Sequence, residues 1–388
     1  MKIYLVVMIS ALSQVGFSGS RVAMSLHSLK LTDNQFAIGV VIALYSLAPF
    51  FLSIVIGRFA DRVSPRLPIL LGSAVMTAAL ILPPAFSGIP VLCATAFVLG
   101  LAHQVFSIPL EAIVGGIDGA KNRARNYAFI TMGWSAANFF GPLIAGFTID
   151  YVGQLEVYLV LAVLTAVPIP ILLMCPDLLP RAAAAHADTA TRGSVLDLWR
   201  VPSVRMTIIA AGVVGSAQDL FQFYLPIYGH SLGFSASAIG TILGLVFVAA
   251  FVIRSILPFL VKKLKEPTIL ISAMLIAALA FTLLPFFGNP YALGAIAFLL
   301  GLGVGCAQPM TMSLLYLFTP AGRIAESFGL QKTVRNGTHL VVPIVFGSVG
   351  AAFGVTTVFL SNAAILLTSG LLMRKADIPA SDLQRREV

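Results

Sequence analysis

The sequence predicts an all-α membrane protein, with twelve transmembrane helices in two six-helix pseudo-repeats around a central cavity. Composition, long apolar runs and an internal repeat lead to this prediction. Of the 388 residues, 59% are hydrophobic and only 10% are charged, whereas soluble proteins carry roughly 25% charged residues. The net charge of +9 is spread over short clusters between apolar runs. It does not form the single basic face that nucleic acid binding requires.

Each apolar run is long enough for one membrane-crossing helix, which needs about 20 mostly apolar residues. The runs are long and lack strict alternation, so helices fit better than the strands of a membrane barrel. The first run resembles a signal peptide, but similar runs continue to the end of the chain, so we expect it to be the first span. The twelve expected helices cover residues 3–27, 35–57, 67–86, 89–113, 124–150, 156–175, 204–229, 236–260, 267–287, 290–318, 325–353 and 355–373.

Lysine and arginine residues gather in alternate connections between these runs, with Lys30 as the exception. The positive-inside rule then places both termini and the long segment 176–203 in the cytoplasm. This polar segment divides the chain into an N-terminal bundle over 1–175 and a C-terminal bundle over 204–388, which ends in a short cytoplasmic tail. Within it, the stretch "VLDLWR" predicts a short surface helix.

The two bundles are related by a constant offset of 201 residues, which places Ala37-Ile38-Gly39 on Ala238-Ile239-Gly240 and Pro142 on Pro343. Six helices per half keep the copies in the same orientation, so they are parallel repeats. This is typical of transporters with a site between two halves. The third, sixth, ninth and twelfth runs contain no charged residue apart from Glu156, at the very start of the sixth, so we expect these helices to face lipid.

The stretch "GRFADRVSPR" follows the second run and carries Gly57, Asp61, Arg62 and Arg66. It resembles the loop signature of the major facilitator superfamily, although Ser64-Pro65 replaces a glycine and a basic residue. The position after the second of twelve spans makes the match more specific, and the resemblance extends over essentially the whole chain.

The resemblance implies a latch at this stretch, with contacts that exist in one conformation only. Gly57 would let two helices approach closely, and Asp61 would meet the positive N-terminal end of a neighbouring helix. The implied partner is the helix over 325–353, which begins near Glu326. Positive-inside anchoring alone would explain the arginines but not Asp61.

A second stretch, "GWSAANFFGPLIAG", resembles the family's antiporter signature in the fifth helix. Gly133, Gly141, Pro142 and Gly146 match it, while Ala145 replaces a glycine. Small residues allow tight packing and the proline bends the helix, and ordinary packing would be the simpler explanation. In the family this signature accompanies proton-driven export. The arginine that such exporters carry in the fourth helix is absent, which argues against their usual proton relay.

Ionisable residues inside a membrane span are costly and therefore mark candidate sites. In the helix over 325–353, Lys332, Arg335 and His339 share one face, with Asn336 beside them. The repeat offset sets this face against Trp134 and Asn138, and we expect both faces to line the cavity. Lys332 alternatively extends to the cytoplasmic surface.

The first and fourth helices add polar residues to the predicted cavity. Gln14 and Arg21 lie on one face of the first, where Arg21 either binds an anionic substrate or extends outward. His103 either relays protons or is simply hydrogen-bonded. The cytoplasmic part of the fourth helix contains Glu111, for which the expected partners are Lys121, Arg123 and Arg125.

The seventh helix presents Gln218, Asp219 and Gln222. Burial would favour the protonated form of Asp219, as a proton carrier needs, whereas a nearby arginine would reverse this preference. Arg254 in the eighth helix is expected to pair with either Glu326, as part of the latch, or Asp219. The cations inside the spans outnumber the acids by one, which suits an organic anion or a zwitterion.

These features predict a secondary transporter that moves small organic molecules by alternating access, most simply by proton-coupled efflux. Proton-coupled uptake of an organic anion is the alternative, and a non-transporting receptor or scaffold is a third possibility. We expect no enzyme activity, because no nucleotide-binding or hydrolase motif occurs. We expect no metal, because the cysteines are far apart, and no cofactor beyond a proton gradient. The expected partners are substrate, protons and lipid, for a monomer in a bacterial inner membrane.

Overall fold

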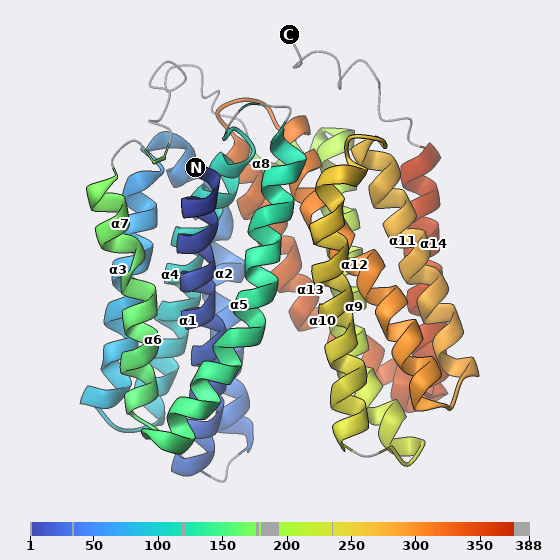
Figure 1. Ribbon diagram of the computed structural model, residues 1–388, viewed down its shortest axis with the longest axis horizontal. Helices are drawn as coiled ribbons and strands as arrows, with labels where there is room; N and C mark the ends of the chain where they lie inside the picture. Colours follow the sequence, from blue (N-terminus) through green and yellow to red (C-terminus); the bar gives the residue numbers. More distant parts are fainter. Residues whose placement is uncertain are drawn as a thin grey trace. The chain divides into compact units, whose positions relative to one another are not determined.

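The computed structural model describes residues 2–32, 35–117, 119, 122–175, 178–179, 194–234 and 236–375, and it is helical throughout these residues apart from short turns. Figure 1 shows long helices that follow one another along the chain. Eleven spans in the described residues are long and apolar enough to cross a membrane. Together with the 30-residue helix α13, they make the twelve predicted transmembrane helices.

The helix boundaries lie close to those expected from the apolar runs. The helices are α1 (Lys2–Leu31), α2 (Gln35–Arg62), α3 (Arg66–Ala85), α4 (Ile89–Val114), α5 (Arg123–Tyr151), α6 (Glu156–Ala166), α7 (Pro168–Met174), α8 (Val195–Arg200), α9 (Pro202–Ser231), α10 (Ala236–Leu260), α11 (Glu266–Leu283), the 3₁₀ turn η3 (Leu284–Phe286), α12 (Pro290–Phe318), α13 (Ile324–Phe353) and α14 (Val355–Lys375). The predicted surface helix is α8. The rest of the predicted linker and the tail after Lys375 lie largely or wholly outside the described residues.

Two predicted spans are interrupted by proline. The run over 156–175 divides into α6 and α7 at Pro168, and the run over 267–287 changes from α11 to the turn η3 at Pro285. A proline has no N–H to donate to the carbonyl four residues earlier, and its ring crowds that carbonyl. The apolar pattern predicted continuous helices here because it records burial and not hydrogen-bonding capacity.

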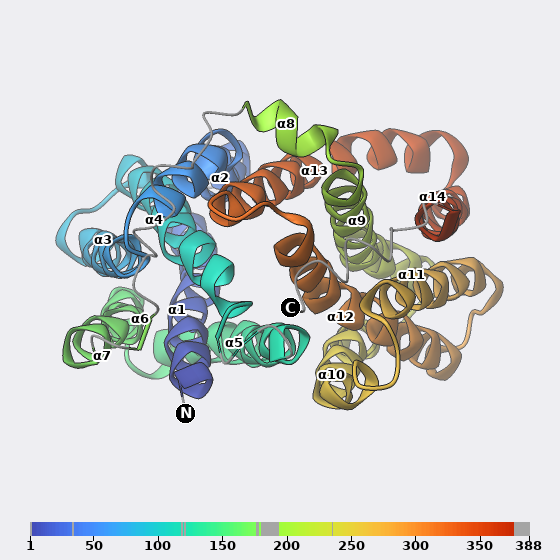
Figure 2. The same cartoon turned by 90° about the horizontal axis from the view of Figure 1, so that it is seen from above.

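The chain forms two compact units whose boundaries differ from the predicted bundles. Unit 1 comprises Met1–Asn122, Met132–Val195 and Pro320–Asn336, and unit 2 comprises Arg123–Thr131, Leu196–Thr319 and Gly337–Val388. The start of α13 thus belongs with the N-terminal helices, beside α2 (Figure 2). The start of α5 belongs with the C-terminal helices. The reason is local contact, since each of these helix starts is held by side chains described below.

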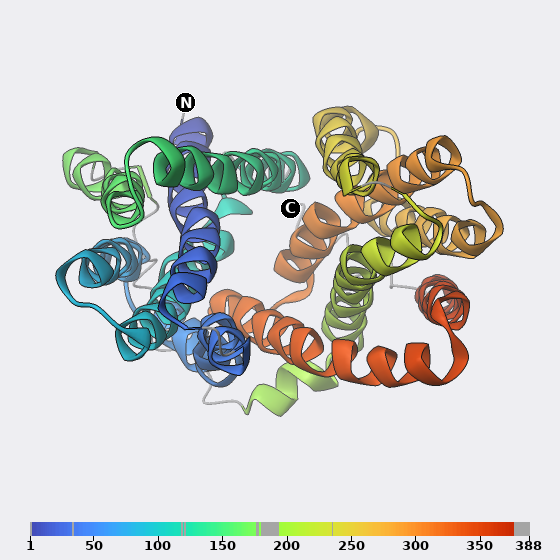
Figure 3. The same cartoon turned by 90° about the horizontal axis from the view of Figure 1, so that it is seen from below.

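Within unit 1, α4 packs against α2 and α3, and α6 packs against α1 and α3, as the view from below shows (Figure 3). Glycines allow α1 and α5 to approach backbone to backbone. A Cβ atom on Gly141 would clash with the Ser18 hydroxyl and lie 2.7 Å from the Val15 carbonyl oxygen. A Cβ on Gly133 would lie 3.0 Å from Val7, whereas one on Gly146 would have no neighbour within 4 Å. The predicted packing motif is therefore tightest at Gly141.

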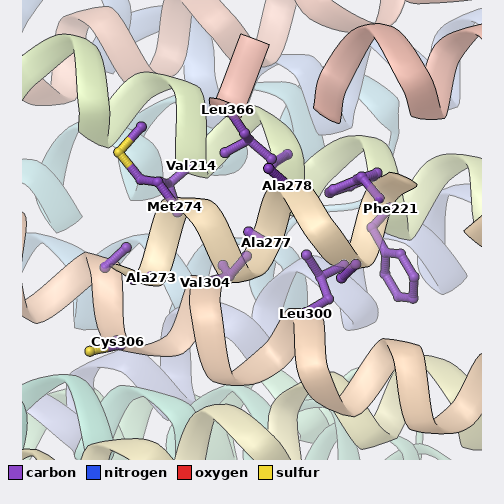
Figure 4. Packing of buried hydrophobic residues seen from close by; sticks show 14 of the residues in the cluster. Val214, Phe221, Ala273, Met274, Ala277, Ala278, Leu300, Val304, Cys306 and Leu366 are labelled. Atoms are coloured by element: carbon purple, nitrogen blue, oxygen red, sulfur yellow. The ribbon is translucent and has the colours of Figure 1, made fainter. Parts of the chain in front are cut away.

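The core of unit 2 is an apolar cluster that joins α9, α11, α12 and α14 (Figure 4). Ala273 and Ala277 present small side chains to α12, and Gly303 there lies so close that an added Cβ would be 2.7 Å from the Ala273 carbonyl oxygen. Larger side chains, including Met274 and Phe281, are fully buried around this contact. Small residues at the helix contact and large ones around it give close packing without requiring a hydrophobic force between helices in lipid.

Replacing Gly141 with alanine should destabilise the protein, because the new methyl group forces α1 and α5 apart. Overpacking of this kind costs about 1–3 kcal/mol. Thermal unfolding of the purified protein in detergent measures the effect. Gly146→Ala is the matched control on the same helix, and it should unfold at the wild-type temperature. Equal melting of the two variants would contradict the packing argument.

Candidate functional site

Asp61 caps the first turn of α13 from another helix. Its two carboxylate oxygens accept the backbone N–H groups of Ala325 and Glu326, each at 2.8 Å. These are among the first N–H groups of a helix, which have no acceptor within the helix itself. The carboxylate also lies at the positive end of the helix dipole. The predicted contact of Asp61 with a helix N-terminus is therefore present in unit 1.

The close approach of α2 and α13 depends on Gly57, where an added Cβ would lie 2.8 Å from the Cα atom of Glu326. The Glu326 carboxylate binds Arg58 through one oxygen and Arg323 through the other, each at 2.7 Å. Arg58 and Arg323 were not among the predicted latch residues, whereas the predicted arginines Arg62 and Arg66 lie elsewhere. Arg62 is exposed at the end of α2, and Arg66 donates to the Leu173 carbonyl of α7 at 3.4 Å.

The contacts that Arg254 makes within unit 2 differ from the predicted pairing with Glu326 or Asp219. Its guanidinium is buried in unit 2 and donates to the Gly305 carbonyl at 3.0 Å, the Thr131 carbonyl at 3.0 Å and the Gln308 side chain at 2.9 Å. Pro309 explains the first of these bonds. Because proline has no N–H, the Gly305 carbonyl four residues earlier loses its helical donor, and Arg254 supplies a replacement. Within unit 2, two backbone carbonyls and one amide oxygen thus accept hydrogen bonds from the buried guanidinium.

Lys332 forms a buried ion pair with Glu111. The ammonium nitrogen of Lys332 lies 2.7 Å from a carboxylate oxygen of Glu111, and the side chains are 23% and 1% exposed. The same nitrogen lies 5.7 Å from the centre of the Trp134 ring, within the range of a cation–π interaction. Lys332 was not among the partners predicted for Glu111. Arg123, which was among them, bonds elsewhere, and Lys121 lies outside the described residues.

Hydrogen bonds between α1 and α5 fix the polar side chains next to this ion pair. The Trp134 indole N–H donates to the Ser10 hydroxyl at 2.7 Å, and one turn further along, Gln14 donates to Asn138 at 2.9 Å. The amide oxygen of Gln14 contacts Nε2 of His103 at 2.9 Å. Because that oxygen can only accept, Nε2 carries the proton.

His103 and Arg21 each have an aromatic neighbour. The imidazole of His103 stacks on the Phe17 ring at 4.0 Å between centres. Its Nδ1 atom is buried with no hydrogen-bond partner in the part of the chain that the structure describes. Arg21 is exposed, and its guanidinium lies 6.0 Å from the Tyr45 ring.

Unit 2 brings together two further predicted residues, Asp219 of α9 and His339 of α13. Nδ1 of the imidazole lies 3.0 Å from a carboxylate oxygen, and the side chains are 21% and 37% exposed for Asp219 and His339. Gln222 is exposed one turn along α9, and Gln218 is partly buried. On α13, Arg335 is partly buried and Asn336 donates back to the Lys332 carbonyl at 2.8 Å.

Sequence reasoning missed a contact at the start of α5. Arg123 donates to the Glu266 carboxylate at 2.8 Å and to the Ser313 hydroxyl at 3.0 Å, all within unit 2. The repeat offset of 201 residues could have indicated this contact, because the offset places Arg123 on Ile324, the first residue of α13. The two related helices are thus each anchored at their first turn by side chains of other helices.

Comparisons with known proteins were made for both sequence and structure. The family model described as Major Facilitator Superfamily matches residues 4–343. The multidrug resistance protein MdtG of Dickeya zeae (strain Ech586) is 26% identical over 90% of this chain and 89% of its own length. The MdtG protein of Enterobacter lignolyticus (strain SCF1) is 27% identical over 46% of this chain and 44% of that protein.

Among solved structures, the major facilitator transporter FucP in the outward conformation has a TM-score of 0.83 at 17% identity. The match covers 97% of this chain and 99% of that one. At this identity the likeness concerns the fold.

Replacing Asp61 with asparagine should destabilise the start of α13. The neutral amide loses the interaction with the helix dipole and offers one oxygen where two N–H groups need acceptors. The expected cost is about 1–2 kcal/mol, measured by thermal unfolding in detergent. Asp150→Asn removes a carboxylate at the exposed end of α5 and should have little effect. If both variants melt alike, the cap is not a significant stabilising contact.

Proposed function

The chain belongs to the Major Facilitator Superfamily, and on this premise we propose that it exports small organic molecules by proton-coupled antiport. It is a multi-pass integral membrane protein and a transporter of small molecules, not an enzyme. We place it in a bacterial inner membrane as a monomer, with both termini in the cytoplasm. The proton gradient is its energy source, and no cofactor is needed.

The observation that carries the proposal is the contact between His339 and Asp219 inside spanning helices of unit 2. Histidine changes its charge nearest to neutral pH of all unperturbed side chains. In the proposed transport cycle this pair binds and releases the transported proton. Partial exposure of both side chains gives protons a way to reach them. A site whose charge changes within the membrane is what coupling to a proton gradient requires.

Two observations support export over uptake. The fifth-helix stretch that resembles the family's antiporter signature forms a tight contact at Gly141 between α5 and α1. In addition, the relatives compared above are named multidrug resistance proteins. Both point to outward movement of organic molecules.

The contacts of Asp61 and Glu326 in unit 1 suit a latch that must open during each transport cycle. They consist of two charge-assisted hydrogen bonds and two ion pairs at one helix terminus. Breaking several modest interactions together gives an energy barrier between conformations that the transport cycle can still cross. Arg58 is 41% exposed, so water can solvate it when its ion pair breaks. We propose that these contacts stabilise one conformation of alternating access.

Proton-coupled uptake of an organic anion is the second candidate function. It is favoured by Lys332 and Arg335, two cationic side chains one turn apart inside a spanning helix. The direction of proton movement distinguishes it from export.

Reconstituted protein with a pH-sensitive dye inside liposomes tests the coupling. An outward gradient is imposed in turn with the cation ethidium and with the anion 4-nitrobenzenesulfonate, and the probe that is transported should draw protons inward and acidify the interior. Asp219→Asn and His339→Gln should remove this acidification, because neither variant retains the paired acid and base. Both variants should still exchange labelled probe against unlabelled probe, since exchange needs no net proton movement.

Asp197→Asn is the control, because this carboxylate lies at the surface beside Arg200 of the same short helix. It should leave the acidification unchanged. A rise of the pH inside the liposomes would favour the alternative function, proton-coupled uptake of an organic anion. Acidification that survives Asp219→Asn would move the proton site to His103.

A further inference from the structure

We propose that Lys332 binds the acid group of an aromatic organic anion, which is the transported substrate, and that the ring of this substrate lies on Trp134. The inference rests on the proposed function, because it assigns the substrate class of that transporter. Glu111 is the resident carboxylate that the substrate's acid group adds to or replaces. The site lies wholly within unit 1, on α4, α5 and α13.

The ion pair is built asymmetrically. Glu111 is almost completely enclosed, whereas about a quarter of the Lys332 side chain is exposed, at 23% against 1%. An ammonium group has three N–H donors, and Glu111 contacts it through one oxygen at 2.7 Å. A small molecule can therefore reach the lysine but not the glutamate. The group it presents must be an acceptor with negative charge, so an amine would gain nothing at this position.

Trp134 provides a flat surface beside the ammonium group. Its ring centre lies 5.7 Å from the Lys332 nitrogen, and its indole N–H is bonded to Ser10 at 2.7 Å. This bond fixes the ring orientation, so a ring on the substrate meets a surface that is already in place. One molecule that carries both an acid group and an aromatic ring can then contact Lys332 and Trp134 at the same time.

The exposed charge at this site also favours an anion. Lys332 is partly exposed, whereas the carboxylate beside it, Glu111, is enclosed. An accessible positive charge attracts an acid group and repels a lipophilic cation.

A purely structural ion pair between α4 and α13 is the alternative. The two roles predict opposite effects of Glu111→Gln on the binding of the anion. Lys332→Gln and Glu111→Gln remove the same ion pair, so a structural role makes both variants weaken binding. If Lys332 binds the anion, its removal weakens binding, whereas removal of the neighbouring negative charge strengthens it. Lys332→Arg keeps the positive charge and should retain binding.

The chain offers its own reporter, because Trp134 and Trp199 are the two tryptophans of the chain. In the Trp199→Phe background, Trp134 fluorescence is recorded while 4-nitrobenzenesulfonate, 4-nitrobenzenesulfonamide or 4-nitrobenzyltrimethylammonium is added to purified protein. The nitro group quenches a nearby indole, and the three probes share a ring but differ in charge. Trp134→Phe leaves Trp199 on α8 and reports non-specific quenching.

The sulfonate alone should quench Trp134 saturably. Lys332→Gln should raise its dissociation constant about tenfold or more, as expected for loss of a hydrogen bond to a charged group. Glu111→Gln should lower that constant. Lys262→Gln, which removes an exposed positive charge after α10, should leave it unchanged. Thermal unfolding confirms that each variant is folded.

Shifts in the same direction for Lys332→Gln and Glu111→Gln would overturn the proposal, as would equal binding of the neutral sulfonamide or preferred binding of the cation. The assay uses no proton gradient. Sulfonate binding that depends on Lys332, together with absent proton movement in liposomes, would therefore refute antiport and leave the substrate class standing. Proton-coupled transport of ethidium without sulfonate binding would support antiport and refute the proposed substrate class.

Discussion

A charged group placed inside an apolar helix must find its compensation within the protein, because lipid offers neither water nor counter-ions. The described residues meet this demand in three ways. Lys332 has a carboxylate partner in Glu111. Arg254 has backbone carbonyls and an amide, and Asp61 has the free N–H groups of a helix terminus. Within unit 1, these contacts join α13 to α4 and to α2. Within unit 2, they join α10 to α12 and to the start of α5.

The three solutions differ in what they allow the protein to do. Arg254 donates to two backbone carbonyls and an amide, none of which titrates, so these three hydrogen bonds remain the same over the physiological pH range. Lys332 and Glu111 form a pair in which one member is enclosed and the other is accessible, which suits exchange of partners. In the contact between His339 and Asp219 both side chains are partly exposed, which agrees with the proton exchange that we propose for this pair. Under the proposals made above, rigid anchoring, ligand binding and proton uptake fall to different positions of one apolar scaffold.

The helical fold could be predicted from the sequence almost residue by residue. Apolar runs bounded by glycine, proline and charge gave α10 and α12 their observed ends, and the breaks at Pro168 and Pro285 were missed because hydropathy does not record a missing N–H. Helix periodicity also grouped Lys332, Arg335 and His339 correctly on one helix face. It could not assign their partners, because periodicity orients a side chain about its own helix and does not say which helix lies opposite. Glu111 was therefore given nearby loop cations, although its partner is more than 200 residues away in the chain. The acceptor of Arg254 was deducible in principle, since Pro309 must leave the Gly305 carbonyl without its helical donor.

The cap that Asp61 provides has a consequence for how the chain can be divided. The first N–H groups of α13 are satisfied by a carboxylate that is encoded about 260 residues earlier. The start of α5 is likewise held by Glu266 and Ser313 from the other half of the sequence. Each half of the gene thus specifies the beginning of a long helix without the groups that complete it. Two fragments made by cutting between α7 and α8 would each present an unfinished helix end, and each would hold the matching groups for the other. Co-expressed halves have a chemical reason to reassemble, and a half produced alone lacks the groups that complete the start of α5 or of α13.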